Sequence, residues 1–291
     1  MKIKAIINIL FIAFFLSSCV TVITIPSPTP SHYLTNTPTP ILIDSGISGE
    51  VVYSYIAPNT TAEQIFLKNL DTGYVTQLTS SGDNSYPVWS PDGSKIIYAV
   101  WTDEKKYSIY IMNKDGSGKT PVMDTLVNER EADWSADGHE VIFVSDKDGN
   151  DEIYKINLDT QVIDRLTFTP YAEAFPHWSP DGNNISFASS NDGGPMHIFV
   201  MDSNGKNLRQ VTNSHVNDVD AHPIWCPDGA CIVFFRLVPS KLLILDLNTA
   251  EISPLLGDIF KSQDETVINM EGFPSRSPVR GYITFAMFGQ F

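Results

Sequence analysis

The heptapeptide P87-V-W-S-P-D-G93 recurs along the chain and decides its fold. Three further copies and one degenerate copy are present: Ala132–Gly138 (ADWSADG), Pro176–Gly182 (PHWSPDG), Pro223–Gly229 (PIWCPDG) and Pro274–Arg280 (PSRSPVR). The tryptophans of the four clear copies lie 45, 44 and 47 residues apart, at Trp89, Trp134, Trp178 and Trp225. A period in this range is typical of proteins built from repeated supersecondary units.

Short runs that predict β-strands follow each copy. In the repeat that begins near Glu131 they are V141-I-F-V144, I153-Y-K-I156 and I163-D-R-L-T167, rich in β-branched and aromatic residues. Within S-P-D-G, proline suits the first corner of a type I turn and glycine the left-handed position after it. Four antiparallel strands per repeat predict an all-β fold in which each repeat is one blade of a β-propeller. The repeated tryptophans are expected to pack between blades.

The segment S145-D-K-D-G-N-D-E-I-Y154 nearly reproduces the middle of a TolB-like repeat. In that family W-S-P-D-G-K is followed by a strand, S-D-R-D-G-N-x-E-I-Y and a closing strand near L-T. The chain therefore resembles the TolB-like β-propeller repeat family over about residues 48–291. The resemblance implies a six-bladed propeller, to which this chain contributes five repeats and a partial sixth. Either its C-terminal strands join N-terminal strands in a shared blade, or the chain is incomplete.

The N-terminal 45 residues predict export and anchoring rather than a folded domain. Residues 1–18 begin with lysines and continue as an apolar run, as in a secretory signal peptide. The following L16-S-S-C19 resembles a bacterial lipobox, so Cys19 is expected to be lipidated; a plain signal peptide with an incidental cysteine is the alternative. Residues 19–45 form a Pro/Thr/Ser-rich tether, and residues 46–291 form the propeller. We expect an extracytoplasmic protein, lipid-anchored to the cell membrane or the outer membrane.

Charge and cysteine content narrow the function classes. The chain has 34 acidic and 19 basic residues and a formal net charge of −15, which disfavours nucleic acid as a partner. Besides Cys19, only Cys226 and Cys231 are present, and they flank the turn of one repeat. They are expected to face each other across a hairpin, either as a disulfide or as two unpaired thiols.

Several stretches resemble sites of chemistry without the context that such sites require. The segment N113-K-D-G-S-G-K-T120 is one glycine short of a phosphate-binding loop, and no helix is expected after it. The segment D146-K-D-G-N-D151 lacks the residue order of a calcium loop and is predicted to be a hairpin turn. The histidines show no metal-ligand spacing, although His177 and His222 both precede tryptophans on innermost strands.

One polar position recurs in every repeat. Counting five residues back from each tryptophan, or from Arg276, gives four carboxylates and one amide: Asn84, Glu129, Glu173, Asp220 and Glu271. Because the segment that carries them enters the innermost strand, the set is expected to ring one mouth of the central channel. Like charges placed there raise one another's pKa unless a cation or a basic partner joins them. The alternative is that each side chain caps its own connecting loop.

These features predict a non-catalytic, lipid-anchored propeller of the cell envelope that binds a protein partner through the loop face around the channel. No cofactor and no metal are expected, and no G-x-S-x-G motif is present. Two alternatives stay open: a glycan-binding surface protein, and a propeller enzyme resembling the metal-dependent polysaccharide lyases.

Overall fold

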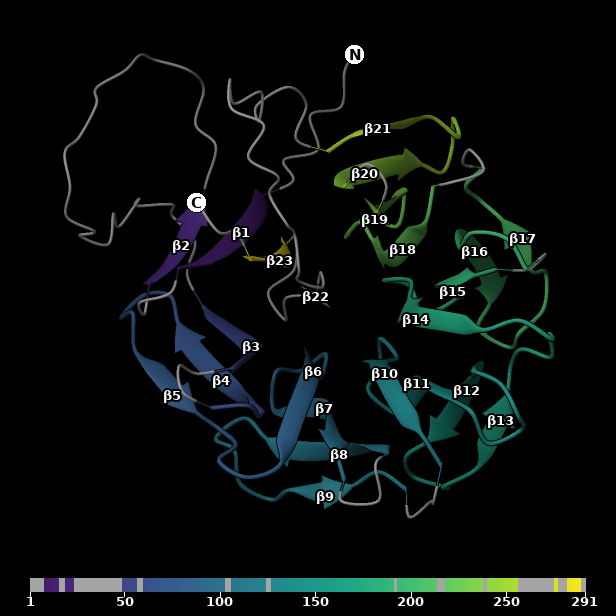
Figure 1. Ribbon diagram of the computed structural model, residues 1–291. Coiled ribbons are helices and arrows are strands. Elements are labelled where there is room, and N and C mark those ends of the chain that lie inside the picture. Colours follow the sequence, from purple (N-terminus) through teal and green to yellow (C-terminus); the bar gives the residue numbers. More distant parts are fainter. Residues whose placement is uncertain are drawn as a thin grey trace, which may run out of the picture.

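The computed structural model describes residues 8–15, 19–23, 49–56, 60–102, 106–123, 127–190, 193–213, 218–237, 240–255, 275–276 and 282–288. The first two and the last two of these ranges are described by their backbone alone. Figure 1 shows small sheets arranged around a central axis, with β6, β10, β14 and β18 nearest to it. The described residues form five antiparallel blades, so the predicted all-β propeller is confirmed.

Four of these blades have four strands each, and they correspond to the four clear heptapeptide copies. The second blade contains β6 (Asp83–Trp89), β7 (Lys95–Trp101), β8 (Tyr107–Asn113) and β9 (Thr120–Pro121). The third contains β10 (Glu129–Trp134), β11 (Glu140–Ser145), β12 (Glu152–Asn157) and β13 (Ile163–Arg165). The fourth contains β14 (Glu173–Trp178), β15 (Asn184–Ser189), β16 (His197–Asp202) and β17 (Arg209–Gln210). The fifth contains β18 (Asp220–Trp225), β19 (Cys231–Leu237), β20 (Ser240–Asp246) and β21 (Ile252–Pro254).

In the described residues the first blade has three strands, and its repeat lacks the heptapeptide. They are β3 (Glu50–Ile56), β4 (Glu63–Asn69) and β5 (Val75–Gln77). A further sheet has the order β2-β1-β23-β22 and consists of β1 (Asn8–Phe15), β2 (Cys19–Ile23), β22 (Ser275–Arg276) and β23 (Tyr282–Phe288). Its β1 and β23 pair in parallel, so the described residues do not show a sixth antiparallel blade. β1 falls within residues 1–18, which the sequence predicts to be a signal peptide.

The heptapeptide forms the turn that the sequence predicts. The amide of Gly93 donates to the carbonyl of Ser90 at 2.9 Å, and Gly93 has a φ of 70°. The Ser90 hydroxyl donates to Asp92 Oδ1 at 2.6 Å and accepts from the Lys95 amide at 2.9 Å. Ser135 and Ser179 make the same pair of bonds in the next two blades. The turn closes the hairpin between the first and second strands of each of these blades.

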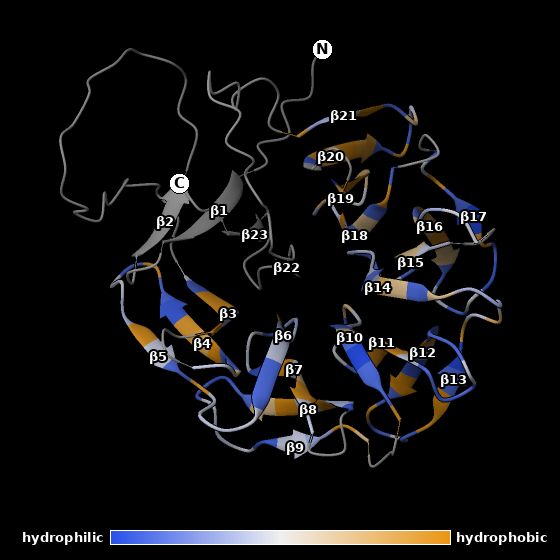
Figure 2. Cartoon of the chain, viewed as in Figure 1, coloured by the Kyte–Doolittle hydropathy of each residue, from blue (hydrophilic) through white to orange (hydrophobic). Residues whose placement is uncertain are grey.

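The tryptophans pack between blades, as predicted. Trp134 of the third blade lies in one buried cluster with Ile97 and Ile109 of the second. Trp178 of the fourth blade packs against Ile142 and Ile153 of the third. Figure 2 shows that hydrophobic residues are concentrated on the middle strands of the blades. The core is thus a series of layers between neighbouring sheets, and each layer needs both of its blades.

The segments that resembled known motifs are hairpin connections. Residues 114–119 connect β8 and β9, and Lys119 Nζ donates to the carbonyl of Gly116 there. Residues 146–149 form a turn closed by the amide of Gly149 and the carbonyl of Asp146 at 3.0 Å. Of the part of the chain that the structure describes, no helix is long and apolar enough to cross a membrane.

Candidate functional site along the innermost strands

The recurring polar position is placed identically in four blades. Its residues sit opposite the final part of the second strand, as the pairs Asn84–Val100, Glu129–Ser145, Glu173–Ser189 and Asp220–Arg236. We call Asn84, Glu129, Glu173 and Asp220 the capping row. Their exposed fractions are 3%, 2%, 1% and 0%. Glu271, the fifth predicted member, lies outside the described residues.

Two members of the capping row bond close to their own loops. Asn84 donates from Nδ2 to the carbonyl of Ser81, three residues earlier, at 2.9 Å. Asp220 accepts two bonds from Arg236 of the neighbouring strand, from Nε to Oδ1 at 2.6 Å and from Nη2 to Oδ2 at 3.0 Å. Arg236 also contacts Asp218 at 3.3 Å, so one guanidinium holds both carboxylates of the incoming loop. Both side chains therefore fix the segment that leads into the innermost strand.

Glu173 joins the third and fourth blades. Its Oε1 accepts from the hydroxyl of Thr169 at 2.6 Å, within the loop that precedes β14. Burial, followed by the electrostatic effect of Glu152 in the third blade, raises the pKa of Glu173 to about 8. Glu152 is itself fully buried and accepts from Arg165 Nη2 at 2.7 Å. The two carboxyl groups and one guanidinium thus form a polar cluster between blades, in which burial favours the protonated form of Glu173.

Burial and local bonding favour loop capping over a shared, solvent-facing ring. The bonds of Asn84, Glu173 and Asp220 go to their own loops, their own blades or the adjoining blade, and the accessible surface of these side chains is close to zero. A side chain that offers no surface cannot be the first contact of a binding partner. We therefore assign the capping row to the architecture of the propeller.

A second row lies two residues further along the same strands. In each of four innermost strands the register shifts by a β-bulge, between Ser85 and Val88 in β6 and at the equivalent places in β10, β14 and β18. One non-glycine residue in each bulge has a φ between 52° and 56°. These residues are Tyr86, Glu131, Phe175 and His222, which we call the bulge row. The left-handed conformation costs about 1–3 kcal/mol for such a residue.

The bulge row is connected from blade to blade. The amide of Phe175 donates to Glu131 Oε2 at 2.6 Å, which links β14 to β10. The rings of Phe175 and His222 lie 3.5 Å apart between centroids, which links β14 to β18. Burial and then the Glu131 carboxylate raise the pKa of Tyr86 to about 12, which places Tyr86 near Glu131. The bulge row therefore links β10, β14 and β18 through direct contacts, and Tyr86 occupies the equivalent position on β6.

The charge states along this row follow from its surroundings. Burial raises the pKa of Glu131, while the Phe175 amide and the guanidinium of Arg130, whose Nε lies 3.4 Å from Oε1, lower it. Burial, followed by repulsion from His177, lowers the pKa of His222 well below its usual value. His222 is therefore neutral at pH 7, and the Tyr86 hydroxyl keeps its proton. The row combines two aromatic rings, a neutral imidazole and a carboxyl group.

The predicted disulfide position also lies beside an innermost strand. Cys226 and Cys231 are joined by a disulfide, with their Cα atoms 5.2 Å apart. Across the described ranges, one set of three potential metal ligands lies close together, and it consists of these two sulfurs and Asp228. The disulfide leaves no thiolate to bind a metal there. His177 instead contacts Asp133, with Nδ1 3.4 Å from Oδ2.

Sequence reasoning missed the bulge row because a bulge has no residue signature of its own. Positive φ normally points to glycine or asparagine, and none of the four positions carries either residue. The sequence does not single these positions out: the position three residues before each tryptophan varies completely, but so does the position directly before it, at Val88, Asp133, His177 and Ile224.

These observations define a β-propeller of repeated antiparallel blades with a variable polar and aromatic row on its innermost strands. Residues 32–250 match the TolB beta propeller domain family. Because this match covers more than half of the chain, the protein belongs to that family. The resemblance to TolB-like repeats is thereby confirmed.

Individual relatives support the same fold. An uncharacterized protein, Atu1656, of Agrobacterium fabrum is 26% identical over 159 residues, which are 52% of this chain and 54% of that protein. The crystal structure of TolB from Acinetobacter baumannii superposes with a TM-score of 0.67 at 24% identity, covering 80% of this chain and 56% of that one. An oligogalacturonate lyase in complex with manganese superposes with a TM-score of 0.54 at 16% identity, covering 71% and 61%. The chain thus spans about half the length of Atu1656 and of the Acinetobacter TolB.

Proposed function

We propose that this protein is a non-catalytic, lipid-anchored propeller of the cell envelope that binds a protein partner through the bulge row. Cys19 would hold it to the cell membrane or the outer membrane, and residues 20–45 would separate the domain from the lipid surface. Family membership supplies the scaffold, and one scaffold hosts many functions. The proposal therefore rests on the bulge row itself.

The observation that carries the proposal is the contrast between a constant backbone and variable side chains. The left-handed bulge recurs in four blades, so the backbone conformation belongs to the architecture. Its side chains are Tyr, Glu, Phe and His, so no shared structural need selects them. All four are partly exposed, although the Glu131 side chain is only 10% exposed and Phe175 also packs against the buried cluster of the fourth and fifth blades. Aromatic residues at half-buried positions are typical anchors of protein interfaces.

The test is capture of a partner by full-length protein, solubilised from native membranes, with and without the bulge row. Phe175→Ala removes the ring that contacts His222, and we expect it to lose the captured protein. Tyr74→Ala is the matched control, because Tyr74 is 78% exposed and follows β4 in the first blade. Equal capture by wild type and Phe175→Ala would contradict the proposal.

The same preparation separates the two alternative functions. Binding on a glycan array that Phe175→Ala abolishes would assign the bulge row to a glycan. Stoichiometric metal in the purified protein, lost when His177 and His222 are replaced, would support the alternative of a metal-dependent propeller enzyme. For the proposed binder we expect neither result.

Anchoring is tested separately. Cys19→Ala should release the protein from membranes, because lipidation requires that thiol and stable anchoring requires the acyl chains. The measurement is membrane fractionation after a salt wash. A Cys19→Ala variant that stays with the washed membranes would show that the lipobox interpretation is wrong.

A further inference from the structure

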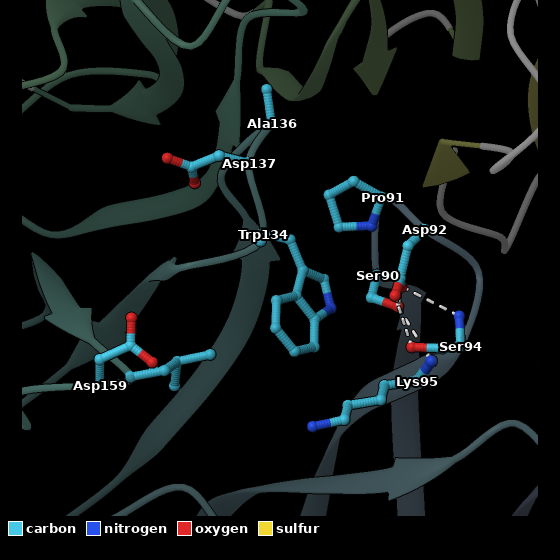
Figure 3. A pocket seen from close by; sticks show the side chains of 11 residues that line it. Ser90, Pro91, Asp92, Ser94, Lys95, Trp134, Ala136, Asp137 and Asp159 are labelled. Atoms are coloured by element: carbon cyan, nitrogen blue, oxygen red, sulfur yellow. Dashed lines mark hydrogen bonds between the residues drawn. The ribbon is translucent and has the colours of Figure 1, made fainter.

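One tryptophan lies outside the heptapeptides and outside the core. The four heptapeptide tryptophans are at most 7% exposed. Figure 3 shows one of them, Trp134, among residues of the second- and third-blade turns. The fifth tryptophan, Trp101, ends β7 and is 39% exposed. Tryptophan is enriched among the residues that contribute most to binding at protein interfaces.

Trp101 belongs to a row of side chains at the capping-row end of the second blade. Asp83 pairs with Trp101 across β6 and β7, and Trp101 pairs with Tyr107 across β7 and β8. Residues opposite each other in antiparallel strands have their Cβ atoms about 5 Å apart and can interact. The rings of Trp101 and Tyr107 are in edge-to-face contact, with their centroids 4.7 Å apart. Trp101 therefore lies between a carboxyl group and a second aromatic ring.

The first blade adds a second carboxyl group. The amide of Glu63, at the start of β4, donates to Asp83 Oδ1 at 2.7 Å, which brings the two acidic residues together. Burial raises the pKa of Glu63, a hydrogen bond with Ser54 lowers it, and the charge of Asp83 raises it again. Burial and then the charges of Asp83 and Glu63 raise the pKa of Tyr107, so its hydroxyl lies near both acidic groups. We call Glu63, Asp83, Trp101 and Tyr107 the aromatic–acidic strip.

The two carboxyl groups of the strip have no basic partner. Within the described part of the chain, neither Glu63 nor Asp83 is part of an ion pair. The basic group that acts electrostatically on the strip is Arg130. Arg130 already donates two hydrogen bonds to Asp151, at 3.1 and 2.6 Å, and its Nε lies 3.4 Å from Glu131 Oε1. The strip therefore combines negative charge and aromatic rings without a cation of its own.

The strip adjoins the bulge row. Burial and then the charge of Glu131 raise the pKa of Tyr86, and Tyr107 and Glu63 raise it further. Tyr86 of the bulge row therefore lies near two residues of the strip, and one partner can contact both surfaces.

We propose that the aromatic–acidic strip binds an arginine side chain of a protein partner. A guanidinium group is planar, so it can stack on the Trp101 ring while its N–H groups reach the carboxylates of Asp83 and Glu63. A bound cation also favours the ionised form of both acidic groups, which repel each other without it. A lysine ammonium matches the charge but not the stacking. The inference rests on the proposed function, because it specifies one chemical group of the partner.

The experiment is calorimetric titration of the full-length protein with three N-acetylated tripeptide amides: tri-arginine, tri-lysine and tri-citrulline. Citrulline has the shape of arginine without its charge, and lysine has the charge without the planar group. We expect tri-arginine to bind at least tenfold more tightly than tri-citrulline and at least threefold more tightly than tri-lysine. Equal affinity for tri-arginine and either of the other peptides would overturn the proposal.

Matched variants separate a local site from the general attraction of cations to a chain of net charge −15. The double variants Glu63→Gln/Asp83→Asn and Asp71→Asn/Asp164→Asn each replace two carboxyl groups by amides. Asp71 and Asp164 are exposed and lie outside the strip, in the first and third blades. We expect the first double variant to lose at least tenfold in affinity for tri-arginine and the second less than twofold. Equal losses would overturn the proposal.

Trp101→Ala tests the aromatic part of the strip. It should lower the affinity for tri-arginine at least fivefold and remove the preference over tri-lysine. Tyr74→Ala, which removes a 78% exposed ring between β4 and β5, is the matched control and should bind as wild type. Melting curves establish that each variant is folded, and the result for the two carboxyl groups stands if Trp101→Ala fails to fold. Unchanged binding by folded Trp101→Ala would overturn the assignment of arginine to this strip.

The peptide titration does not use the captured partner, so the two proposals fail separately. Equal capture by wild type and Phe175→Ala would contradict the proposed function and leave the peptide result standing. Loss of capture by Phe175→Ala, together with equal binding of tri-arginine and tri-citrulline, would overturn the arginine site alone.

Discussion

The capping row and the bulge row lie two residues apart on the same four strands. The blades share side-chain chemistry in the first row and backbone conformation in the second. In the capping row the chemistry is constant, an amide or a carboxyl group, and Asn84, Glu173 and Asp220 form hydrogen bonds with nearby loops and strands. In the bulge row the backbone is constant and the side chains differ. Constant chemistry with local bonds indicates architecture, whereas varied chemistry on a fixed backbone indicates recognition.

Truncating a tryptophan in the hydrophobic core between two blades should have the largest effect on stability. Trp178 is 1% exposed and packs between the third and fourth blades. Trp178→Ala should lower the free energy of unfolding by about 3–5 kcal/mol through lost burial and a residual cavity. Urea denaturation measures it. An unchanged unfolding midpoint would mean that the tryptophan layers do not hold the blades together.

Replacing one residue of the capping row should lower the free energy of unfolding by a smaller amount. Asp220→Asn removes the charge that Arg236 holds with two bonds, and we expect about 2 kcal/mol of lost stability from a charged hydrogen-bonded pair. Asp164→Asn, on an exposed position of β13, is the matched control and should be near neutral. Equal stability of the two variants would show that the Asp220 carboxylate does not stabilise the fold.

The pH dependence of stability tests the Glu152–Glu173 cluster. The pKa of Glu173 is raised from 4.5 to about 8, so the folded state binds a proton that the unfolded state releases between these values. The free energy of unfolding should therefore fall as the pH rises from 4.5 to about 8, by at most about 1.4 kcal/mol per pH unit from this group. Glu173→Gln should flatten that slope. Identical slopes for wild type and variant would show that the cluster holds no proton.

The blades were predictable because local chemistry specifies them. The Ser-Pro-Asp-Gly turn satisfies itself through the Ser90, Asp92 and Lys95 bonds, so it forms wherever the tetrapeptide occurs between strands. The capping row was also predictable in position, because counting back from tryptophan follows the strand register. Its role was left open between two alternatives, since burial depends on the packing of neighbouring blades.

Other features depend on contacts that no local pattern records. The pairing of β1 with β23 joins residues near the two ends of the chain. The charge state of Glu173 depends on Glu152 in the preceding blade, 21 positions earlier in the sequence. The bulge row depends on a register shift between paired strands, which alternation of residue types does not mark. The aromatic–acidic strip forms because Glu63 of the first blade meets Asp83 of the second.

The most direct test of the two-row account measures stability and partner affinity on the same variants. The double variant Tyr86→Phe/Glu131→Gln changes the chemistry of the bulge row and keeps its side-chain shapes, and Glu173→Gln changes the capping row. For the protein captured from native membranes, the account predicts at least tenfold weaker binding to the double variant with a nearly unchanged melting temperature. It predicts wild-type binding by Glu173→Gln with an altered melting temperature. Weaker binding by Glu173→Gln together with wild-type binding by the double variant would contradict the account.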